Sequence, residues 1–150
     1  MSSIAGVDST TSAELAAPAP NLAMRVLGPA AAALAMLSAF TMSLMATFLL
    51  GADGAISGMG SVTADLQADL FEACGKGDLD GARRINDRLD PLVRVFYAPP
   101  FVDMHNRMKE ALVLLGRIPA AYVRPPLTPV SASEREAIRR ALVESALLPA

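Results

Sequence analysis

The side chains that could carry out chemistry are few and scattered. The chain has one histidine, His105, and one cysteine, Cys74, so it cannot build a zinc site from His and Cys ligands. Its lysines are Lys76, in a Gly-Lys-Gly-Asp turn, and Lys109, within a predicted helix. Residues 58–61 are glycine-rich and precede a predicted helix, where exposed N–H groups attract anions. Neither a third glycine at dinucleotide spacing nor a Walker lysine follows, so the sequence predicts no metal site and little phosphate binding.

The composition of the 150 residues excludes several classes of protein. Hydrophobic residues make up 53% of the chain, which excludes disorder throughout because so much apolar surface does not stay in water. The formal net charge of −2 gives no overall field that would favour nucleic acid. A single cysteine excludes a disulfide scaffold and is typical of a reducing compartment. We therefore expect one cytoplasmic domain that binds no nucleic acid.

A long run without ionisable groups occupies residues 26–52, with Arg25 before it and Asp53 after it. The run exceeds the ~20 residues that a membrane-spanning helix needs, and its flanking charges suit a positive-inside orientation. Small and hydroxyl-bearing residues are frequent in it, which also suits a helix buried in an α/β domain. Two alternatives follow: a single-pass membrane protein spanning about residues 26–50, or a buried helix over about residues 30–50.

Short apolar segments predict three strands, at residues 3–7, 22–27 and 53–57, each closed by glycine, proline or polar residues. Strands that alternate with helices form a parallel sheet. The last strand precedes four predicted helices, at residues 63–74, 79–98 and 101–115 and from Ser131 onward.

Local signals mark the boundaries of these helices. Pro91 lies inside the second of the four and predicts a kink or a break there. Residues 119–129 contain four prolines and are expected to cross the molecule in an extended form. Ser131 and Glu134 have the spacing of a capping box at the start of the last helix.

Residues 51–61 read GADGAISGMGS and resemble the last barrel strand of the dihydrodipicolinate synthase / N-acetylneuraminate lyase family. Three later stretches resemble the family's C-terminal helices and the proline-rich strap before the last of them: GDLDGARRINDRLDPLV, RMKEALVLLGRI and VRPPLTPVSASEREAIRRAL. Upstream, the stretch IAGVDSTTSAEL is similar to the strand that carries the family's Schiff-base lysine. The resemblance covers about residues 47–148, with its motifs in the family's order and spacing.

The resemblance implies a (β/α)8 barrel with added C-terminal helices. Such a barrel takes about 250 residues and rarely fewer than 200. For 150 residues we therefore expect an α/β protein that forms an incomplete TIM (β/α)8 barrel, with about the last three strands and a C-terminal helical extension. Residues 1–60 are expected to form the partial barrel segment with its long apolar helix, and residues 61–150 the helical region of the same domain.

The resemblance also implies class I aldolase or lyase chemistry on pyruvate or a 2-keto acid. A lysine amine attacks the keto carbon, and the resulting iminium acts as an electron sink. No cofactor and no metal are implied. Val7 stands where the family has this lysine, and valine cannot form an imine. We therefore expect no catalytic residue in this chain and no activity of the chain alone.

Four substrate-binding positions carry over from the resemblance. In the family, backbone groups at the last strand lie near the keto acid, which implies Ile56, Ser57 and Gly58 here. Gly28 matches the glycine that ends the previous strand, although proline and alanine follow it in place of the family's polar residues. A second interpretation stays open, in which the glycines only permit a tight strand-to-helix turn.

The partners implied by the resemblance are a small-molecule keto acid and further copies of the chain. In the family the C-terminal helices contribute to oligomer contacts, so a homo-oligomer is expected. An alternative is a non-catalytic protein that joins an intact family oligomer through these helices. The membrane is a partner only if residues 26–50 span it.

Overall fold

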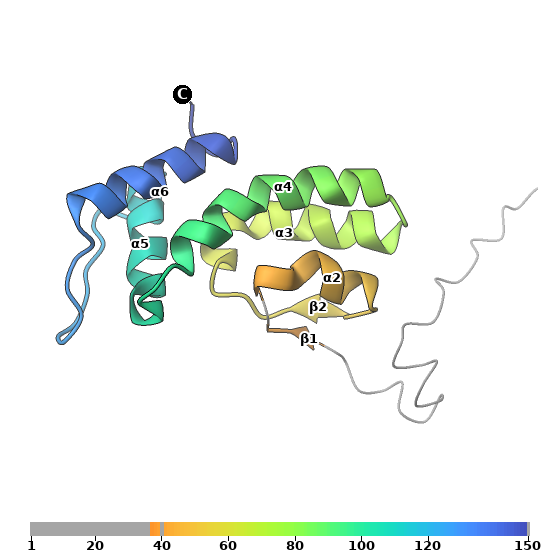
Figure 1. The fold of residues 1–150 in the computed structure, drawn as a ribbon, viewed down its shortest axis with the longest axis horizontal. Helices are drawn as coiled ribbons and strands as arrows, with labels where there is room; N and C mark the ends of the chain where they lie inside the picture. The colour runs from red at the N-terminus through yellow and green to blue at the C-terminus, as the bar shows by residue number, and fades with distance from the viewer. Residues whose placement is uncertain (1–36, 40, 150) are drawn as a thin grey trace, which may run out of the picture.

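The computed structural model describes residues 37–39 and 41–149. These residues form a mostly helical α/β arrangement with a small parallel sheet at its lower edge in Figure 1. The α-helices are α2 (Leu44–Leu49), α3 (Gly60–Gly75), α4 (Leu79–Phe96), α5 (Met104–Leu114) and α6 (Ala132–Glu144), with short 3-10 turns η1 (Thr41–Ser43) and η2 (Phe101–Asp103). The predicted helices at 63–74, 79–98 and 101–115 are thus confirmed, with small shifts at their ends.

The sheet consists of two parallel strands, β1 (Leu37–Ser38) and β2 (Gly54–Ala55). In their register Leu37 lies beside Gly54 and Ser38 beside Ala55. α2 lies in the connection between the strands, so the segment is a short β-α-β unit. The predicted strand at 53–57 and the parallel pairing are confirmed, whereas the predicted strands at 3–7 and 22–27 lie outside the described residues.

The single helix expected over about residues 30–50 is wrong in the part that the structure describes. β1 and η1 precede α2, which begins only at Leu44. The Ser38 carbonyl accepts a hydrogen bond from the Ile56 N–H at 2.8 Å, so pairing with a distant strand overrides the local helical preference. No helix among the described residues is long and apolar enough to cross a membrane.

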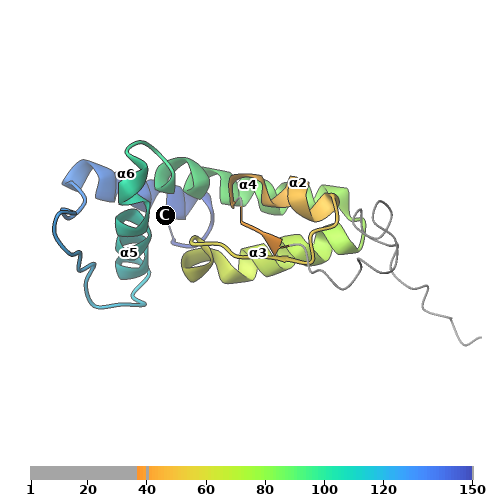
Figure 2. The same cartoon turned by 90° about the horizontal axis from the view of Figure 1, so that it is seen from below.

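The core lies mainly between α3 and α4, which run side by side in both Figure 1 and Figure 2. Each helix contributes apolar side chains three, four or seven positions apart, spacings that place them on one face. The buried members are Val62, Leu66, Leu70 and Ala73 from α3, and Ala82, Leu89, Leu92 and Phe96 from α4. α2 closes one side of this pair, where Phe48 meets the ring of Phe71 edge-on at 5.1 Å.

Pro91 does not end α4, so the break that the sequence suggested there is absent. The helix runs from Leu79 to Phe96 with Pro91 inside it. Leu89 and Leu92, on either side of the proline, are buried in the core. Their packing offsets the helical hydrogen bond that proline cannot donate.

α6 begins with the predicted capping box. The Ser131 hydroxyl accepts a hydrogen bond from the Glu134 N–H, and the Glu134 carboxylate accepts one from the Ser131 N–H at 3.0 Å. The preceding proline-rich segment, residues 119–129, contains neither helix nor strand, as expected. It is held by Lys109, whose Nζ donates to the Tyr122 carbonyl at 2.8 Å, and by Asn106, which donates to the Thr128 carbonyl.

A buried arginine joins three helices. The Arg107 side chain, on α5, is 3% exposed. Its guanidinium donates to the backbone carbonyl oxygens of Phe96, Ala98, Pro99 and Pro100, where the chain leaves α4. It also donates to the Glu134 carboxylate at 3.2 Å, in the first turn of α6. The planar group with its five N–H donors therefore fixes α4, α5 and α6 relative to one another.

Replacing this arginine is expected to be strongly destabilising. In Arg107→Met four carbonyls and the Glu134 carboxylate lose their donor, so we expect the free energy of unfolding to fall by about 3 kcal/mol or more. Arg94→Met is the matched control, because Arg94 pairs with Asp90 on the exposed side of α4 and its loss should cost less than about 0.5 kcal/mol. Urea unfolding followed by circular dichroism measures both values. Equal effects of the two substitutions would contradict the role given to Arg107.

The capping box makes the stability depend on pH. Hydrogen bonds from the Ser131 N–H and hydroxyl, and a weaker contribution from Arg107, lower the pKa of Glu134 below its ordinary value of 4.5. Because the folded state has the lower pKa, the carboxylate stabilises the fold above pH 4.5, and this stabilisation is lost as the pH falls through the folded-state pKa.

Glu134→Gln keeps a capping side chain but does not titrate. We expect the wild-type chain to be more stable than Glu134→Gln at neutral pH, and the difference to shrink steadily below pH 4.5. Urea unfolding at a series of pH values gives the difference directly. A difference that stays constant as the pH falls would show that the ionisation of Glu134 is not linked to folding.

Candidate functional site

The candidate site lies where the two parallel strands end. In α/β proteins, ligands bind beyond the carboxyl ends of parallel strands, because neighbouring strands present their following loops at the same edge. Ala39 follows β1, and Ile56, Ser57 and Gly58 follow β2. The structure thus brings three of the four predicted substrate-binding residues to this edge. Gly28, the fourth, lies outside the described residues.

The side chain of Ile56 points to the uncovered face of the sheet. Ile56 follows Gly54 by two residues, and Gly54 pairs with Leu37, so the side chains of Ile56 and Leu37 lie on the same face. The two residues are 68% and 53% exposed. The backbone of Ile56 is nevertheless held, because its N–H donates to the Ser38 carbonyl at 2.8 Å. This residue therefore combines a fixed backbone with an open apolar side chain.

Ser57 faces the helices instead. Its hydroxyl accepts a hydrogen bond from the Thr41 hydroxyl at 3.0 Å and another from the Gln67 side-chain amide at 3.1 Å. Thr41 belongs to η1, after β1, and Gln67 belongs to α3. Sequence reasoning missed both residues. One signal could have pointed to Gln67: it is a polar residue between Leu66 and Leu70 on the buried side of a helix, where a polar side chain needs a hydrogen-bond partner.

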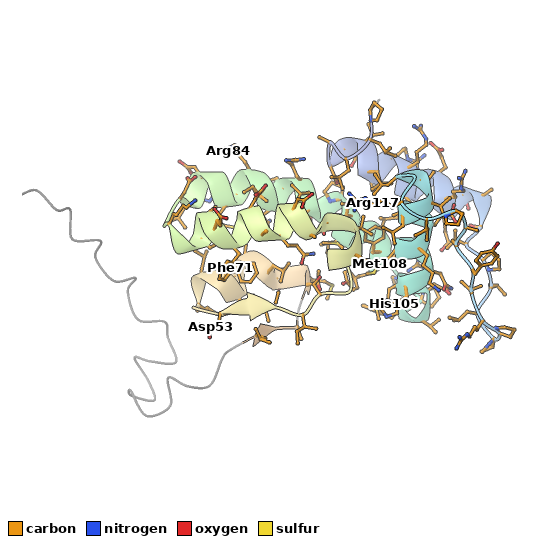
Figure 3. The ribbon with its side chains drawn as sticks, turned by 180° about the vertical axis from the view of Figure 1, so that it is seen from behind. Asp53, Phe71, Arg84, His105, Met108 and Arg117 are labelled. Atoms are coloured by element: carbon orange, nitrogen blue, oxygen red, sulfur yellow. The ribbon has the colours of Figure 1, made fainter. Side chains whose placement is uncertain are left out.

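Gly58 lies against α5. A Cβ atom at this position would be 3.4 Å from Cε1 of His105 and 3.7 Å from Sδ of Met108, and Figure 3 labels both side chains on α5. α5 is itself tied to the start of α3 by Arg117, which donates to the Val62 carbonyl at 3.0 Å. A Cβ at these distances would make ordinary van der Waals contact with α5, so the loop lies directly against this helix.

Neither lysine lies at the strand ends. Lys76 follows α3, and its Nζ pairs with the Glu72 carboxylate at 2.8 Å on the surface. The hydrogen bond from Lys76 to Glu72 raises the pKa of Lys76, which favours the protonated amine and opposes nucleophilic attack. Lys109 donates to the Tyr122 carbonyl in the proline-rich segment. Val7, the position expected for the Schiff-base lysine, lies outside the described residues.

Among the described residues, His105 is a further reactive group near this edge, because its ring lies against Gly58. Burial raises the pKa of the Cys74 thiol, near the end of α3, and a raised pKa lowers the fraction of reactive thiolate. Within residues 37–39 and 41–149, no three His, Cys, Asp or Glu side chains are grouped so that they could hold a metal ion. The strand edge therefore offers backbone groups, hydroxyls, an apolar side chain and the nearby His105 ring, which suit binding and orienting a small molecule.

Comparison with known proteins identifies the family of this chain. The sequence model of the Dihydrodipicolinate synthetase family matches residues 4–145 of the chain. A 4-hydroxy-tetrahydrodipicolinate synthase from Rhodopseudomonas palustris (strain BisA53) is 41% identical over 112 residues, which cover 75% of this chain and 36% of that protein.

Solved structures of the same family resemble the fold. YagE from Escherichia coli K12, a prophage protein of the dihydrodipicolinic acid synthase family solved in complex with pyruvate, matches with a TM-score of 0.66 and 29% identity. The match covers 75% of this chain and 37% of YagE. The Acinetobacter baumannii dihydrodipicolinate synthase complexed with pyruvate matches with a TM-score of 0.67 and 25% identity, over 77% of this chain and 38% of that one.

These matches agree on the family and on the share of each relative that the chain covers. The chain spans between 36% and 38% of the length of the three proteins compared. The expected resemblance was placed at about residues 47–148, and the family match extends it toward the N-terminus, to residue 4. By sequence and by fold, the chain belongs to the dihydrodipicolinate synthetase family.

Proposed function

We propose that the chain forms part of a lyase that acts on pyruvate or a 2-keto acid, and that it supplies one wall of the keto acid site. The observation that carries this proposal is the parallel pair β1 and β2, with Ile56, Ser57 and Gly58 together at the carboxyl edge. Backbone groups of these three residues, and of Gly28 after the preceding strand, would border the keto acid. The presence of pyruvate in two structurally similar family members supports this substrate class.

In this proposal the chain is an incomplete (β/α)8 barrel, with about the last three strands and the C-terminal helices. Residues 1–60 contribute the barrel segment and residues 61–150 the helical region of the same domain. The uncovered face of the sheet supports the assignment, because exposed side chains such as Leu37 and Ile56 are those that further barrel strands would cover. The single cysteine is the ground for placing the reaction in the cytoplasm.

The lysine of the proposed reaction must come from outside this chain. Its amine attacks the keto carbon, a C–N bond forms, and water leaves to give the iminium. The iminium accepts the electron pair of the C–H or C–C bond that breaks at the adjacent carbon, and the resulting enamine donates that pair when a new bond forms there. Lys76 and Lys109 are both engaged away from the strand edge, and Val7 occupies the position where the family resemblance places the lysine. The role left to this chain is to bind and orient the keto acid.

The proposal predicts the outcome of imine trapping with pyruvate and borohydride. Mass spectrometry of the chain alone should show no reduced pyruvate adduct on Lys76 or Lys109. Co-expression with the part of the Rhodopseudomonas palustris relative that precedes its match to Leu37 should give a complex, with the adduct on a lysine of that fragment. The fragment without this chain should give none, because one wall of its site is missing.

A charge on the uncovered face is the control for correct assembly. Leu37→Glu should abolish both the complex and the adduct, because it places a carboxylate where strands would pack. Leu79→Glu should leave both intact, since Leu79 is also exposed but lies on α4. An adduct on this chain's own lysines, or a complex that traps no pyruvate, would contradict the proposal.

A second candidate is a non-catalytic partner in an oligomer of the family. Phe101 and Val102 support it, because two neighbouring apolar residues in η2 are each more than half exposed, and such patches are typical of association surfaces. The same pair could join two copies of this chain, as the predicted homo-oligomer requires.

Light scattering after size exclusion tests both forms of association. We expect the wild-type chain to elute with a mass that is a multiple of 15.6 kDa, and Phe101→Ser/Val102→Ser to shift it toward 15.6 kDa because less apolar surface would be buried. Co-purification with the full-length Rhodopseudomonas palustris relative separates the mixed oligomer from the homo-oligomer. A wild-type monomer that retains no relative would contradict both.

A further inference from the structure

Four polar side chains form a continuous hydrogen-bonded network behind the strand edge. Thr41 donates to the Ser57 hydroxyl at 3.0 Å, and Gln67 donates to the same hydroxyl at 3.1 Å. The second amide proton of Gln67 goes to the Thr63 hydroxyl at 2.9 Å. Thr63 in turn donates to the Met59 carbonyl at 3.0 Å. The network therefore joins η1, the β2–α3 loop and α3.

The network is buried, which makes its hydrogen bonds costly to lose. Thr41, Thr63 and Gln67 are each less than a tenth exposed, and a buried polar group without a partner carries a desolvation cost. The side-chain amide of Gln67 donates both of its protons within the network, one to Ser57 and one to Thr63. Ser57 consequently has a defined position, set from two sides by groups that belong to different elements.

Holding Ser57 also holds its neighbours in the chain. Ile56 and Gly58 flank it, and the Ile56 N–H is bonded to Ser38 on the adjacent strand. Side chains alternate across a strand, so Ser57 anchors the backbone on the helix side while Ile56 faces the open side. The loop of residues 56–58 is therefore fixed from the helix side, and its opposite side is left free for a ligand.

We propose that Thr41 and Gln67 are positioning residues, which act through Ser57 to set the backbone that borders the keto acid. This inference rests on the proposed function. It adds residues from η1 and α3 that sequence reasoning did not associate with the site. Neither residue contacts the substrate in this arrangement; each determines where the backbone groups of Ile56 and Gly58 lie.

Near-isosteric variants test the network while changing packing little. Thr41→Val removes one donor, and Gln67→Met removes the amide but keeps the chain length of the side chain. Thr41→Ser restores the hydroxyl and serves as the conservative rescue. Thr47→Val is the matched control, because the Thr47 hydroxyl donates only to the Leu44 carbonyl within α2. Circular dichroism establishes that each full-length variant is folded before it is compared.

The first measurement is hydrogen exchange of the Ile56 amide, which donates to the Ser38 carbonyl, in the nitrogen-labelled full-length chain, followed by NMR. We expect exchange to accelerate about fivefold in Thr41→Val and Gln67→Met, because one net hydrogen bond is lost at the loop. Thr41→Ser and Thr47→Val should exchange like the wild type. Unchanged exchange in Thr41→Val and Gln67→Met would overturn the inference.

The second measurement uses the complex that traps pyruvate. The half-saturating pyruvate concentration for adduct formation should rise about fivefold in the same two variants, while the rate at saturation changes less than about twofold. Faster exchange with an unchanged half-saturating concentration would overturn the inference and leave the proposed function standing. Failure of the wild-type complex to trap pyruvate would overturn the proposed function, and this inference with it.

Discussion

The buried guanidinium of Arg107 is the interaction on which most of the described structure depends. Arg107 belongs to α5. Its guanidinium donates hydrogen bonds to the carbonyls at the end of α4 and to the carboxylate at the start of α6. A cation so fully removed from water is stable only with its partners in place, so the three helices keep one arrangement. That arrangement presents His105 and Met108 of α5 to Gly58. The geometry of the strand edge is thus set partly by a buried charge in the same turn of α5 that contacts Gly58.

The two faces of the small sheet have different surroundings. Ser38 and Ser57 face the helices, where Ser57 is hydrogen-bonded to Thr41 and Gln67, whereas Leu37 and Ile56 face outward and are exposed. A two-stranded sheet has little stability of its own in water, so α2 and α3 supply the packing that keeps it formed. The helix side is complete, and the open side is apolar. This asymmetry agrees with the proposed incomplete barrel, because barrel strands face helices on one side and other strands' side chains on the other.

Local periodicity accounts for most of what could be predicted. The spacing of Ala82, Leu89, Leu92 and Phe96 indicated α4 correctly, and the Ser131–Glu134 pair located the start of α6. Prediction failed where distant contacts outweigh local preference. Pro91 predicted a kink or a break, and the break is absent because burial of its neighbours keeps α4 continuous. Leu37 and Ser38 sat inside a run that suggested a helix, because nothing local reveals that β2 pairs with them.

The sequence by itself determined the helices after residue 60, their caps and the family, since each depends on residues a few positions apart or on motifs read in order. It also brought Ile56, Ser57 and Gly58 forward as candidates. Only the tertiary structure decided that Leu37–Ser38 is a strand, that Arg107 is buried, and that Thr41 and Gln67 converge on Ser57. The physical reason is that periodicity states which face of an element is apolar, whereas the partner of a buried polar group is settled by how separate elements pack.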